Sequence, residues 1–389
     1  MRFAREELPT GTPVVGVVGG GQLARMMQQA AIALGVQLRV LAEDELVSAA
    51  QVIADAPVGD YRHAEAVRRF AAGCDVVTFD HEHVPTGLLH TLEADGVAVR
   101  PGPDALVHAQ DKSVMRARLD EIGAPSPAHA LAATPADVIA FAEKAGFPVV
   151  LKTTRGGYDG KGVWFAKGPD DIAIDQAFAT GVPILAEEKV DFVRELSALV
   201  ARSPHGQAVA YPVVESVQDD GICVEVTAPA PGLSTAAATR AQQIALTIAG
   251  ELGVTGVLAV EMFETRDGRL LVNELAMRPH NTGHWTIDGA VTSQFENHLR
   301  AVLDLPLGAP TARASYTVME NVLGGEVADM HKGLLHVMAR DPELKVHLYG
   351  KPVRPGRKVG HVTAYGEELE QVRERARHAA AYLTGTIDE

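Results

Sequence analysis

Two glutamates inside apolar, strand-like segments, Glu261 and Glu274, are the residues of this sequence that most clearly suggest chemistry. The segments 256–263 and 269–275 flank Asp267-Gly268, a dipeptide typical of a tight β-hairpin turn. If this dipeptide supplies the two central turn residues, counting outward along the strands places Glu261 directly opposite Glu274. Their Cβ atoms would then lie roughly 4.5–5.5 Å apart on one face of the hairpin.

Two carboxylates so close together within apolar strands repel each other, so a cation is expected between them. Mg²⁺ commonly takes one or two carboxylates together with substrate phosphate oxygens, and Mn²⁺ is an alternative ion. The competing interpretation is a solvated strand edge that tolerates the repulsion. We expect Glu261 and Glu274 to be metal ligands, because acids are rarely buried without a partner.

The segment 152–162, KTTRGGYDGKG, is rich in glycine and carries several cations. It follows a predicted strand at 147–152, and Arg155 and Lys161 are interleaved with the glycines. Glycines let backbone N–H groups approach phosphate oxygens, and the cations offset phosphate charge. The segment lacks the Walker A pattern. It therefore predicts a polyphosphate-covering loop, with a solvated hairpin turn as the alternative.

A second glycine-rich segment, GGGQLA at 19–24, lies between a predicted strand and a predicted helix. Glu43 and Asp44 follow the next strand, where an acid could bind the ribose of a nicotinamide cofactor. The amide groups at a helix N-terminus favour an anion of any kind. A nicotinamide cofactor, a sugar phosphate and a tight turn without ligand all remain open from these residues.

Residues 276–286, AMRPHNTGHWT, follow Glu274 and contain several groups that bind anions or transfer protons. Arg278 could bind a phosphate or carboxylate through two hydrogen bonds, and His280 and His284 ordinarily titrate near neutral pH. A basic cluster nearer the C-terminus could be a phosphate clamp or a solvated loop. It comprises Lys351, Arg354, Arg357, Lys358 and His361.

The composition limits the class of protein that carries these groups. A chain of 389 residues predicts two or three domains, and its net charge of −15 argues against a nucleic-acid partner. Cys74 and Cys223 form no CxxC pattern, and no apolar run reaches the length of a membrane span. We expect a cytoplasmic protein that acts on small molecules.

The predicted elements alternate in a way that could position these groups. Strands separated by alanine-rich helices predict a parallel α/β sheet over about the first hundred residues, with the strands at 14–18, 38–41 and 75–79. A second region of strands and glycine-rich loops extends from 147 to about 304. The proline-rich segment 305–310 indicates a linker. Beyond it we expect strands at 315–321 and 346–349 and a final helix from Glu367.

The chain also carries motifs of a known family along most of its length. It resembles the ATP-grasp superfamily and, within it, the N5-carboxyaminoimidazole ribonucleotide synthetase (PurK) family. The motifs are GGGQLARM at 19–26, FDHEHV at 79–84, KTTRGGYDGKG at 152–162, EEKVDFVRELS at 187–197, YPVVESV at 211–217, VEMF at 260–263, NELAMRPHNTGHWTIDGAVTSQFENHLRAV at 273–302 and YGKPVRPGRKVGHVT at 349–363.

The resemblance implies an α/β ATP-grasp fold with a Rossmann-like domain at 1–106, an ATP-grasp domain at 107–308 and a small C-terminal domain at 309–389. It implies that ATP, bicarbonate and 5-aminoimidazole ribonucleotide react through carboxyphosphate, with Mg²⁺, in a homodimer. On this interpretation the glycine-rich loop at 19–24 faces the substrate phosphate, and the nicotinamide interpretation fails.

The resemblance also implies roles for individual residues. ATP contacts are expected at Lys112, Lys152, Gly157, Tyr158, Asp159, Gly160, Lys161, Gly162, Glu187, Glu188, Lys189, Val190, Glu195, Asn273 and Glu274. Substrate contacts are expected at Gly21, Gln22, Leu23, Glu82, Arg155, Asn281 and Lys358. Catalytic roles are expected for Arg278, His280, Lys351 and Arg357.

The sequence departs from the family at Asp80, Val163 and Gln218, where many relatives carry Glu, Gln and His. The last departure leaves a nucleotide contact unassigned. The alternatives are an ATP-grasp ligase for another acid and amine, such as formate with glycinamide ribonucleotide, or a biotin carboxylase. A Rossmann oxidoreductase and a nucleotide sensor without catalysis belong to other classes.

Overall fold

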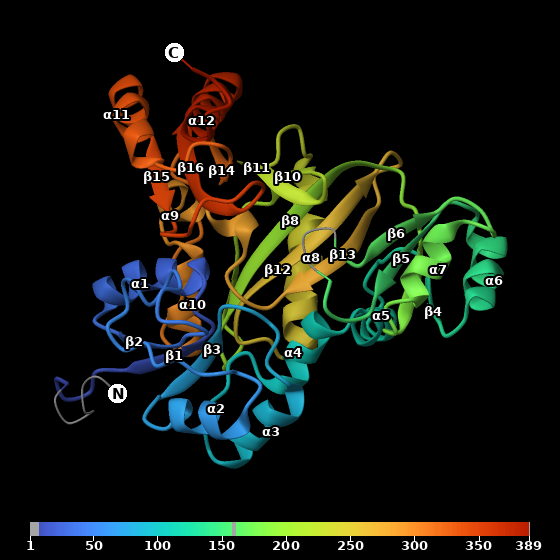
Figure 1. Cartoon of the computed structure of the whole chain (residues 1–389), viewed down its shortest axis with the longest axis horizontal. Coiled ribbons are helices and arrows are strands. Elements are labelled where there is room, and N and C mark those ends of the chain that lie inside the picture. Colours follow the sequence, from blue (N-terminus) through green and yellow to red (C-terminus); the bar gives the residue numbers. More distant parts are fainter. Residues whose placement is uncertain (1–7, 158–160, 389) are drawn as a thin grey trace.

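The fold contains three β-sheets that are covered by helices (Figure 1). It is described here from a computed structural model for residues 8–157 and 161–388. Tyr158, Asp159 and Gly160, three of the expected ATP contacts, lie outside these residues. Within them, no helix combines the length and the hydropathy that crossing a membrane requires.

The N-terminal sheet has three parallel strands in the order β2-β1-β3, which confirms the predicted parallel α/β unit. Its strands are β1 Val14–Val18, β2 Gln37–Leu41 and β3 Val76–Phe79. Its helices are α1 Gln22–Leu34, α2 Ala64–Ala71 and α3 Thr86–Ala94. All residues of β1 and β3 are buried, as expected for parallel strands covered on both faces.

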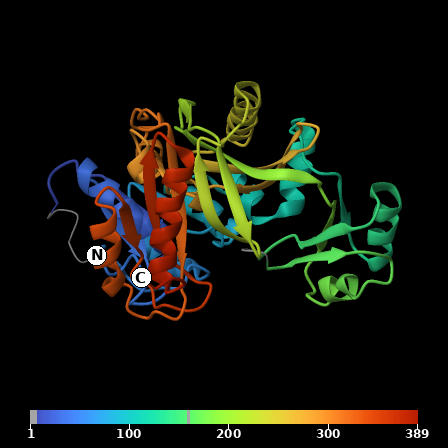
Figure 2. The same cartoon turned by 90° about the horizontal axis from the view of Figure 1, so that it is seen from above.

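A small antiparallel sheet, in the order β4-β7-β5-β6, stands apart from the rest of the molecule (Figures 1 and 2). Two helices, α4 Pro103–Gln110 and α5 Lys112–Glu121, connect it to the N-terminal sheet. Its elements are β4 His129–Ala132, α6 Pro135–Ala145, β5 Val149–Thr153, β6 Val163–Ala166, α7 Ile172–Phe178 and β7 Ile184–Glu188.

The largest sheet follows the order β13-β12-β8-β10-β11-β14-β16-β15, with β9 paired to β8. Its strands are β8 Phe192–Arg202, β9 Ala208–Ala210, β10 Val214–Asp219, β11 Ile222–Ala228, β12 Gly256–Thr265, β13 Leu270–Ala276, β14 Tyr316–Leu323, β15 Lys345–Leu348 and β16 Lys358–Gly366. Its helices are α8 Thr235–Glu251, α9 Thr286–Gly289, α10 Gln294–Val302, α11 His331–Arg340 and α12 Leu369–Thr384.

The C-terminal strands extend this sheet, because β11 pairs with β14. The predicted linker at 305–310 therefore connects two parts of one sheet. The domain boundaries after residues 106 and 308 stay predictions. The elements themselves agree closely with the sequence: β14, β15 and the final helix α12 each begin within two residues of the expected position.

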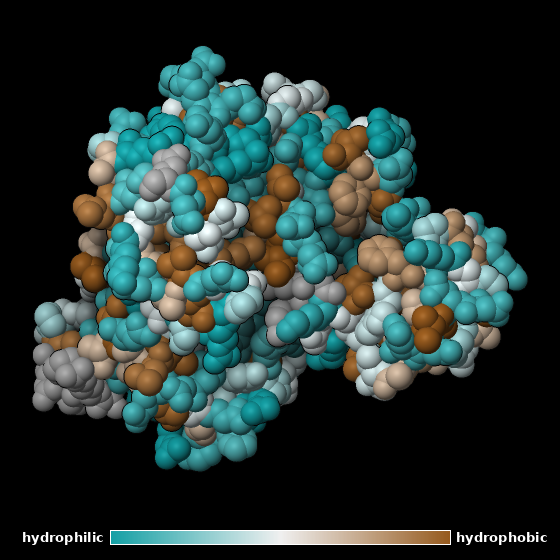
Figure 3. Space-filling view, turned by 45° about the horizontal axis from the view of Figure 1, so that its top comes forward, coloured by the Kyte–Doolittle hydropathy of each residue, from teal (hydrophilic) through white to brown (hydrophobic). Residues whose placement is uncertain are grey.

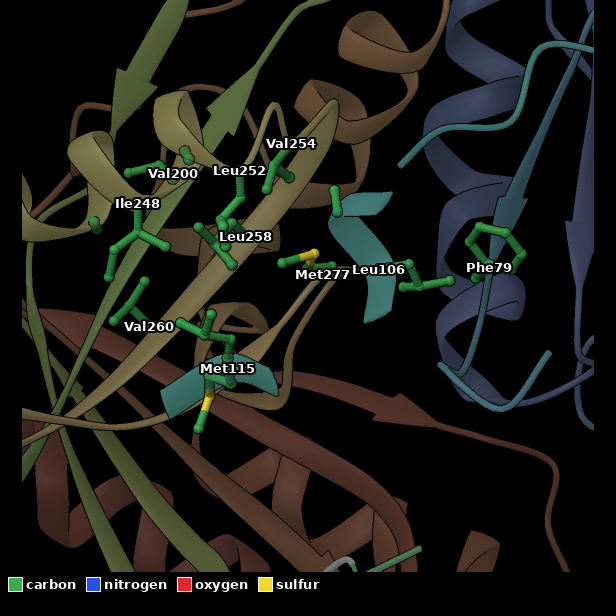
Figure 4. Packing of buried hydrophobic residues seen from close by; sticks show 14 of the residues in the cluster. Phe79, Leu106, Met115, Val200, Ile248, Leu252, Val254, Leu258, Val260 and Met277 are labelled. Atoms are coloured by element: carbon green, nitrogen blue, oxygen red, sulfur yellow. The ribbon is translucent and has the colours of Figure 1, made fainter. Parts of the chain in front are cut away.

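One hydrophobic cluster joins the N-terminal sheet to the largest sheet (Figure 4). Phe79 of β3, Leu106 of α4 and Met115 of α5 belong to it together with Val260 of β12, and each is at most 1% exposed. Because Met115 is packed in this cluster, helix α5 is fixed between the two sheets. The face of α5 that carries its charged side chains is therefore fixed as well.

The C-terminal part contains a buried acid that we expect to destabilise the fold. Glu320 of β14 lies directly opposite Glu225 of β11, whose carboxylate accepts from Arg373 at 2.9 Å and Arg377 at 2.7 Å. Glu320 Oε2 is buried without a hydrogen-bond partner among the described residues. Burial, followed by the charge of Glu225, raises the pKa of Glu320 to about 8.

Replacing Glu320 by glutamine is therefore expected to raise Tm increasingly between pH 5 and 8. A carboxyl whose pKa is raised in the folded state contributes stability that is present below its unfolded pKa and is lost as pH rises through 8. The difference amounts to about 1.4 kcal/mol for each unit of pKa shift. Calorimetry of Glu320→Gln beside the exposed control Glu374→Gln tests this, and equal pH profiles would contradict it.

Candidate active site

A cavity of 1430 Å³ lies between the small sheet, the largest sheet and the N-terminal domain. The surface narrows where the lobe formed by the small sheet joins the main body (Figure 3). The predicted residues that line the cavity are Gln22, Leu23, Glu82, Lys112, Lys152, Arg155, Gly157, Lys161, Gly162, Glu187, Glu188, Lys189, Val190, Glu195, Glu261, Asn273, Glu274, Arg278, His280, Asn281 and Lys358.

The hairpin pairs Glu261 with Glu274, as the turn counting predicted, but the turn itself differs from the prediction. The Thr265 amide donates to the Arg269 carbonyl at 2.9 Å, which leaves a loop of three residues rather than two. Gly268 has a φ of 79°, the left-handed conformation that a three-residue loop requires at its last position. Near the turn, the register is therefore shifted by one residue from the predicted one.

A β-bulge at Asn273 restores the register before the glutamates are reached. Met262 pairs with Val272, whereas the neighbouring Glu261 pairs with Glu274, so Asn273 is an additional residue on β13. The predicted pairing of Glu261 with Glu274 is confirmed, because the additional turn residue and the bulge shift the register in opposite directions. The bulge is thus what places both carboxylates on the same face.

The electrostatics of the glutamate pair fit a divalent cation. Burial, then the charges of Glu274 and Glu195, raises the pKa of Glu261 to about 8. Lys112 Nζ lies 3.4 Å from Glu274 Oε1 and offsets part of the charge. Among the described residues, no group of three or more His, Cys, Asp or Glu side chains is placed to enclose a metal. A divalent cation held by these two carboxylates would keep coordination positions for substrate oxygens.

His280 contacts this pair as a neutral imidazole. Its Nδ1 accepts from the Thr282 amide, so its Nε2 carries the proton and faces Glu261 Oε1 at 3.3 Å. Burial lowers the pKa of His280 well below its usual value, and burial lowers the pKa of His284 to about 3. The expectation that these histidines titrate near neutral pH is wrong, because both lie inside the protein.

Lys152 spans the gap between the small and the largest sheet. Its Nζ lies 2.7 Å from Glu187 Oε2 and donates to Asn273 Oδ1 at 3.0 Å. Although burial alone raises the pKa of Glu187, the charges of Lys152 and Arg116 lower it to about 2. Lys152 is therefore held with its ammonium group in the cavity, close to the glutamate pair.

Three residues that the sequence did not single out, Phe192, Phe263 and Asp111, line the cavity or bond its lining residue Arg155. Phe192 and Phe263 line it with their rings stacked at a centroid separation of 4.6 Å. Asp111 caps α5 and accepts from Arg155 at 2.7 Å. Gln218 also lines the cavity and donates to Ser216 Oγ at 2.7 Å. Single aromatic residues on separate strands carry no sequence signal, which is why they were missed.

The substrate-binding role expected for the glycine-rich loop at 19–24 stays a prediction, and Gln22 and Leu23 of this loop line the cavity. Asp80 accepts from the amides of Gly21 at 3.1 Å and Ala24 at 2.8 Å, and Glu43 accepts from that of Gly20 at 3.0 Å. These amides are occupied by the protein's own carboxylates, and Gly21 does not line the cavity. A Cβ at Gly21 would lie 2.1 Å from an Asp80 oxygen, so the close approach of Asp80 requires glycine there.

Cationic and amide groups on the segment that follows Glu274 also line the cavity. Arg278 Nε donates to Glu82 Oε2 at 2.7 Å, and the Asn281 side-chain amide lines the cavity with no hydrogen-bond partner among the described residues. Lys351 donates to Gln22. Lys351 and Arg357 do not line the cavity themselves.

The predicted basic cluster is not a single surface. Arg357 donates to the Pro352 carbonyl at 3.4 Å, whereas His361 is buried and its Nδ1 bonds the Tyr349 hydroxyl at 2.7 Å. Burial lowers the pKa of His361 well below its usual value. His361 therefore does not belong to a basic cluster. The roles expected for Lys351 and Arg357 stay predictions.

Three protein families match successive parts of the chain. Residues 13–110 match the ribonucleotide synthetase preATP-grasp domain, 117–295 the ATP-grasp domain, and 317–375 the phosphoribosylaminoimidazole carboxylase C-terminal domain. The three matches follow the chain in the order in which the corresponding motifs occur.

Curated and solved relatives cover nearly the whole chain. The N5-carboxyaminoimidazole ribonucleotide synthase of Mycobacterium tuberculosis is 57% identical over 96% of this chain and 88% of its own length. A carboxyaminoimidazole ribonucleotide synthase from Aspergillus clavatus complexed with ATP matches with 35% identity and a TM-score of 0.88, covering 96% and 98% of the two chains.

A second structure from Aspergillus clavatus holds ADP and 5-aminoimidazole ribonucleotide. It matches with 33% identity and a TM-score of 0.87, covering 97% and 99% of the chains. Identity at this level over almost the full length, together with the glutamate pair and the cationic residues that line one cavity, places the sequence in one family. The chain belongs to the N5-carboxyaminoimidazole ribonucleotide synthase (PurK) family of ATP-grasp enzymes.

Proposed function

We propose that this protein catalyses the ATP-dependent carboxylation of 5-aminoimidazole ribonucleotide by bicarbonate in purine biosynthesis. The products are N5-carboxyaminoimidazole ribonucleotide, ADP and phosphate. A bicarbonate oxygen attacks the γ-phosphorus, so ADP leaves and carboxyphosphate forms. The exocyclic amine then takes the carboxyl group, losing a proton as phosphate departs.

The observation that carries this proposal is a single cavity lined by two chemically different sets of residues. Its volume of 1430 Å³ exceeds the roughly 300–1,000 Å³ of an ordinary ligand pocket, so it can hold a nucleotide and a second substrate together. One set has the lysines and the glutamate pair, and the other has Arg278 and Asn281. We assign the first set to a nucleotide end and the second to an acceptor end, and the reacting groups would meet between them.

At the nucleotide end, Lys112 and Lys152 would bind the phosphates, and the strand end at 187–190 would contact the adenine. The apolar walls formed by Phe192 and Phe263 would exclude water from the base. Each lysine is already paired with a carboxylate, Lys112 with Glu274 and Lys152 with Glu187. Both side chains are therefore pre-oriented, which lowers the entropic cost of binding ATP.

Glu261 and Glu274 would hold Mg²⁺. When bound, the ion would offset the charge of the phosphates and of the transferring phosphoryl group. His280 donates its Nε2 proton toward Glu261 and so keeps that carboxylate oriented. Mn²⁺ would satisfy the same oxygen ligands.

At the acceptor end, Arg278 is held by Glu82, so its position is set before substrate binds. The unpartnered amide of Asn281 can both donate and accept, as a ribonucleotide or carboxyphosphate requires. Gln22 and Lys351 bond one another at the edge of this end. A bound substrate would replace some of these hydrogen bonds with its own.

The nicotinamide alternative is disfavoured by the loop at 19–21. The acid expected to bind a ribose, Glu43, instead accepts from the Gly20 amide at 3.0 Å. Asp80 occupies the N-terminus of α1, where a pyrophosphate would otherwise bind.

An assay of ADP release tests the proposed function. Mixing the protein with ATP and Mg²⁺ is expected to give rapid ADP release only when both bicarbonate and 5-aminoimidazole ribonucleotide are present. Glycinamide ribonucleotide with formate is the control pair and is expected to give none. Release that is indifferent to the aminoimidazole substrate would refute the proposal.

A cytoplasmic location and a homodimer complete the proposal. Both follow from the family resemblance. Sedimentation velocity of the full chain is expected to show a species of twice the 41.2 kDa chain mass.

A further inference from the structure

Arg116 is a buried arginine that no motif predicted. It lies on α5 and is 1% exposed. A buried guanidinium is tolerated only where its N–H groups find acceptors. Its Nε donates to Glu187 Oε1 at 2.6 Å, its Nη1 to the Val272 carbonyl at 2.8 Å and its Nη2 to the Asn273 carbonyl at 2.9 Å.

Two of these acceptors are the carbonyls of the bulge that precedes Glu274. Without the bulge, the register near the turn would continue and place Asn273 opposite Glu261. Because side chains alternate along a strand, Glu274 would then point to the other face of the sheet. A guanidinium that bonds both carbonyls stabilises the bulged strand over the slipped one.

The third acceptor connects Arg116 to the phosphate lysine. Glu187 accepts from Arg116 through Oε1 and faces Lys152 Nζ through Oε2 at 2.7 Å. Lys112 precedes Arg116 by four residues, so both side chains lie on one face of α5. Lys112 Nζ lies 3.4 Å from Glu274 Oε1.

We propose that Arg116 is a positioning residue of the nucleotide site. It holds the bulge that turns Glu274 toward Glu261, and it orients the carboxylate that holds Lys152. Arg116 touches neither substrate nor metal in this role and acts through the residues that do. The inference rests on the proposed ATP-dependent function.

The competing explanation is that Arg116 only stabilises the fold. Arg39 provides a matched control, because it is 6% exposed and has the same kinds of partner. Its Nη1 donates to the carbonyls of Phe70 at 2.8 Å and Ala72 at 3.1 Å, and its Nε lies 3.3 Å from Asp55. It belongs to the N-terminal sheet and does not line the cavity.

The test compares Arg116→Lys with Arg39→Lys in the full chain, by calorimetric titration with ADP in the presence and absence of Mg²⁺. We expect Arg116→Lys to weaken binding of ADP with Mg²⁺ by about 10- to 100-fold, the usual cost of losing a partner behind a metal ligand. Binding without Mg²⁺ is expected to weaken less. Arg39→Lys is expected to lower Tm but leave both affinities within about twofold, since distant sites act independently.

Wild-type affinity for ADP with Mg²⁺ in folded Arg116→Lys would overturn the inference, and so would an equal loss with and without the ion. If Arg116→Lys does not fold, Arg116→Gln, which keeps a donor for one bulge carbonyl, is judged by the same two criteria. ADP binding does not depend on the acceptor substrate. Failure of the carboxylation assay would therefore refute the proposed function and leave this comparison intact.

Discussion

Replacing Glu274 by glutamine is expected to reduce substrate-dependent ADP release by about 10³-fold or more. The substitution keeps the size of the side chain but removes one of two negative charges that would hold the cation. Charge stabilisation by a metal in phosphoryl transfer is worth several kcal/mol, and each 1.36 kcal/mol is about tenfold in rate. Single-turnover measurement of ADP formation at saturating ATP and Mg²⁺ reports this step directly.

Glu264→Gln is the matched control for this substitution. Glu264 lies three residues from Glu261 on the same strand, but it accepts from Arg194 at 2.5 Å and does not line the cavity. Glu264→Gln is expected to lower the stability of the protein. The molecules that stay folded are expected to form ADP at the wild-type rate. Turnover by Glu274→Gln at the rate of this control would contradict the metal-ligand assignment.

Lys152→Met is expected to have the second largest effect, raising the KM for ATP and lowering kcat, together by about 10²–10³-fold in kcat/KM. The ammonium group is held by Glu187 and Asn273 at the junction of two sheets, and the Lys152 side chain is only 13% exposed, so its charge is screened less than one on the surface. Methionine fills the space without the charge. Initial rates across a range of ATP concentrations measure both constants.

The control for Lys152→Met is Lys144→Met, which removes an exposed lysine from α6 of the same lobe. It is expected to leave both constants unchanged. The KM for 5-aminoimidazole ribonucleotide is expected to change little in either variant. A selective rise in that KM for Lys152→Met would place the lysine at the acceptor end and contradict our assignment.

Several elements follow from the sequence because their information is local. The run Val14–Val18 has the predicted bounds, and the helix Gln22–Leu34 follows the glycine-rich loop as predicted. The pairing of Glu261 with Glu274 was predicted from the turn, although the true turn has one more residue and the bulge compensates. Turn length and bulges are set by packing around the hairpin, so counting alone does not reveal them.

The glycine-rich loop at 19–24 has partners that its local pattern does not reveal. The loop pattern correctly predicted a strand followed by a helix with amides at its start. It did not predict that Asp80, 59 positions from Gly21, would occupy those amides. The histidines also depend on the tertiary structure, because burial lowers the pKa values of His280, His284 and His361.

The sequence by itself determined the kinds of groups present: the hairpin acids, the lysines of the cavity and the family motifs that name the reaction. These features can be recognised in the sequence because they depend on residue type and on short spacings. Only the tertiary structure decided which of these groups bond other groups of the protein and which line the cavity. Arg116 bonds partners 71 and 156 positions away, and contacts over such separations produce no recognisable spacing pattern in the sequence. The glutamates face one another because those distant contacts hold the bulge between them.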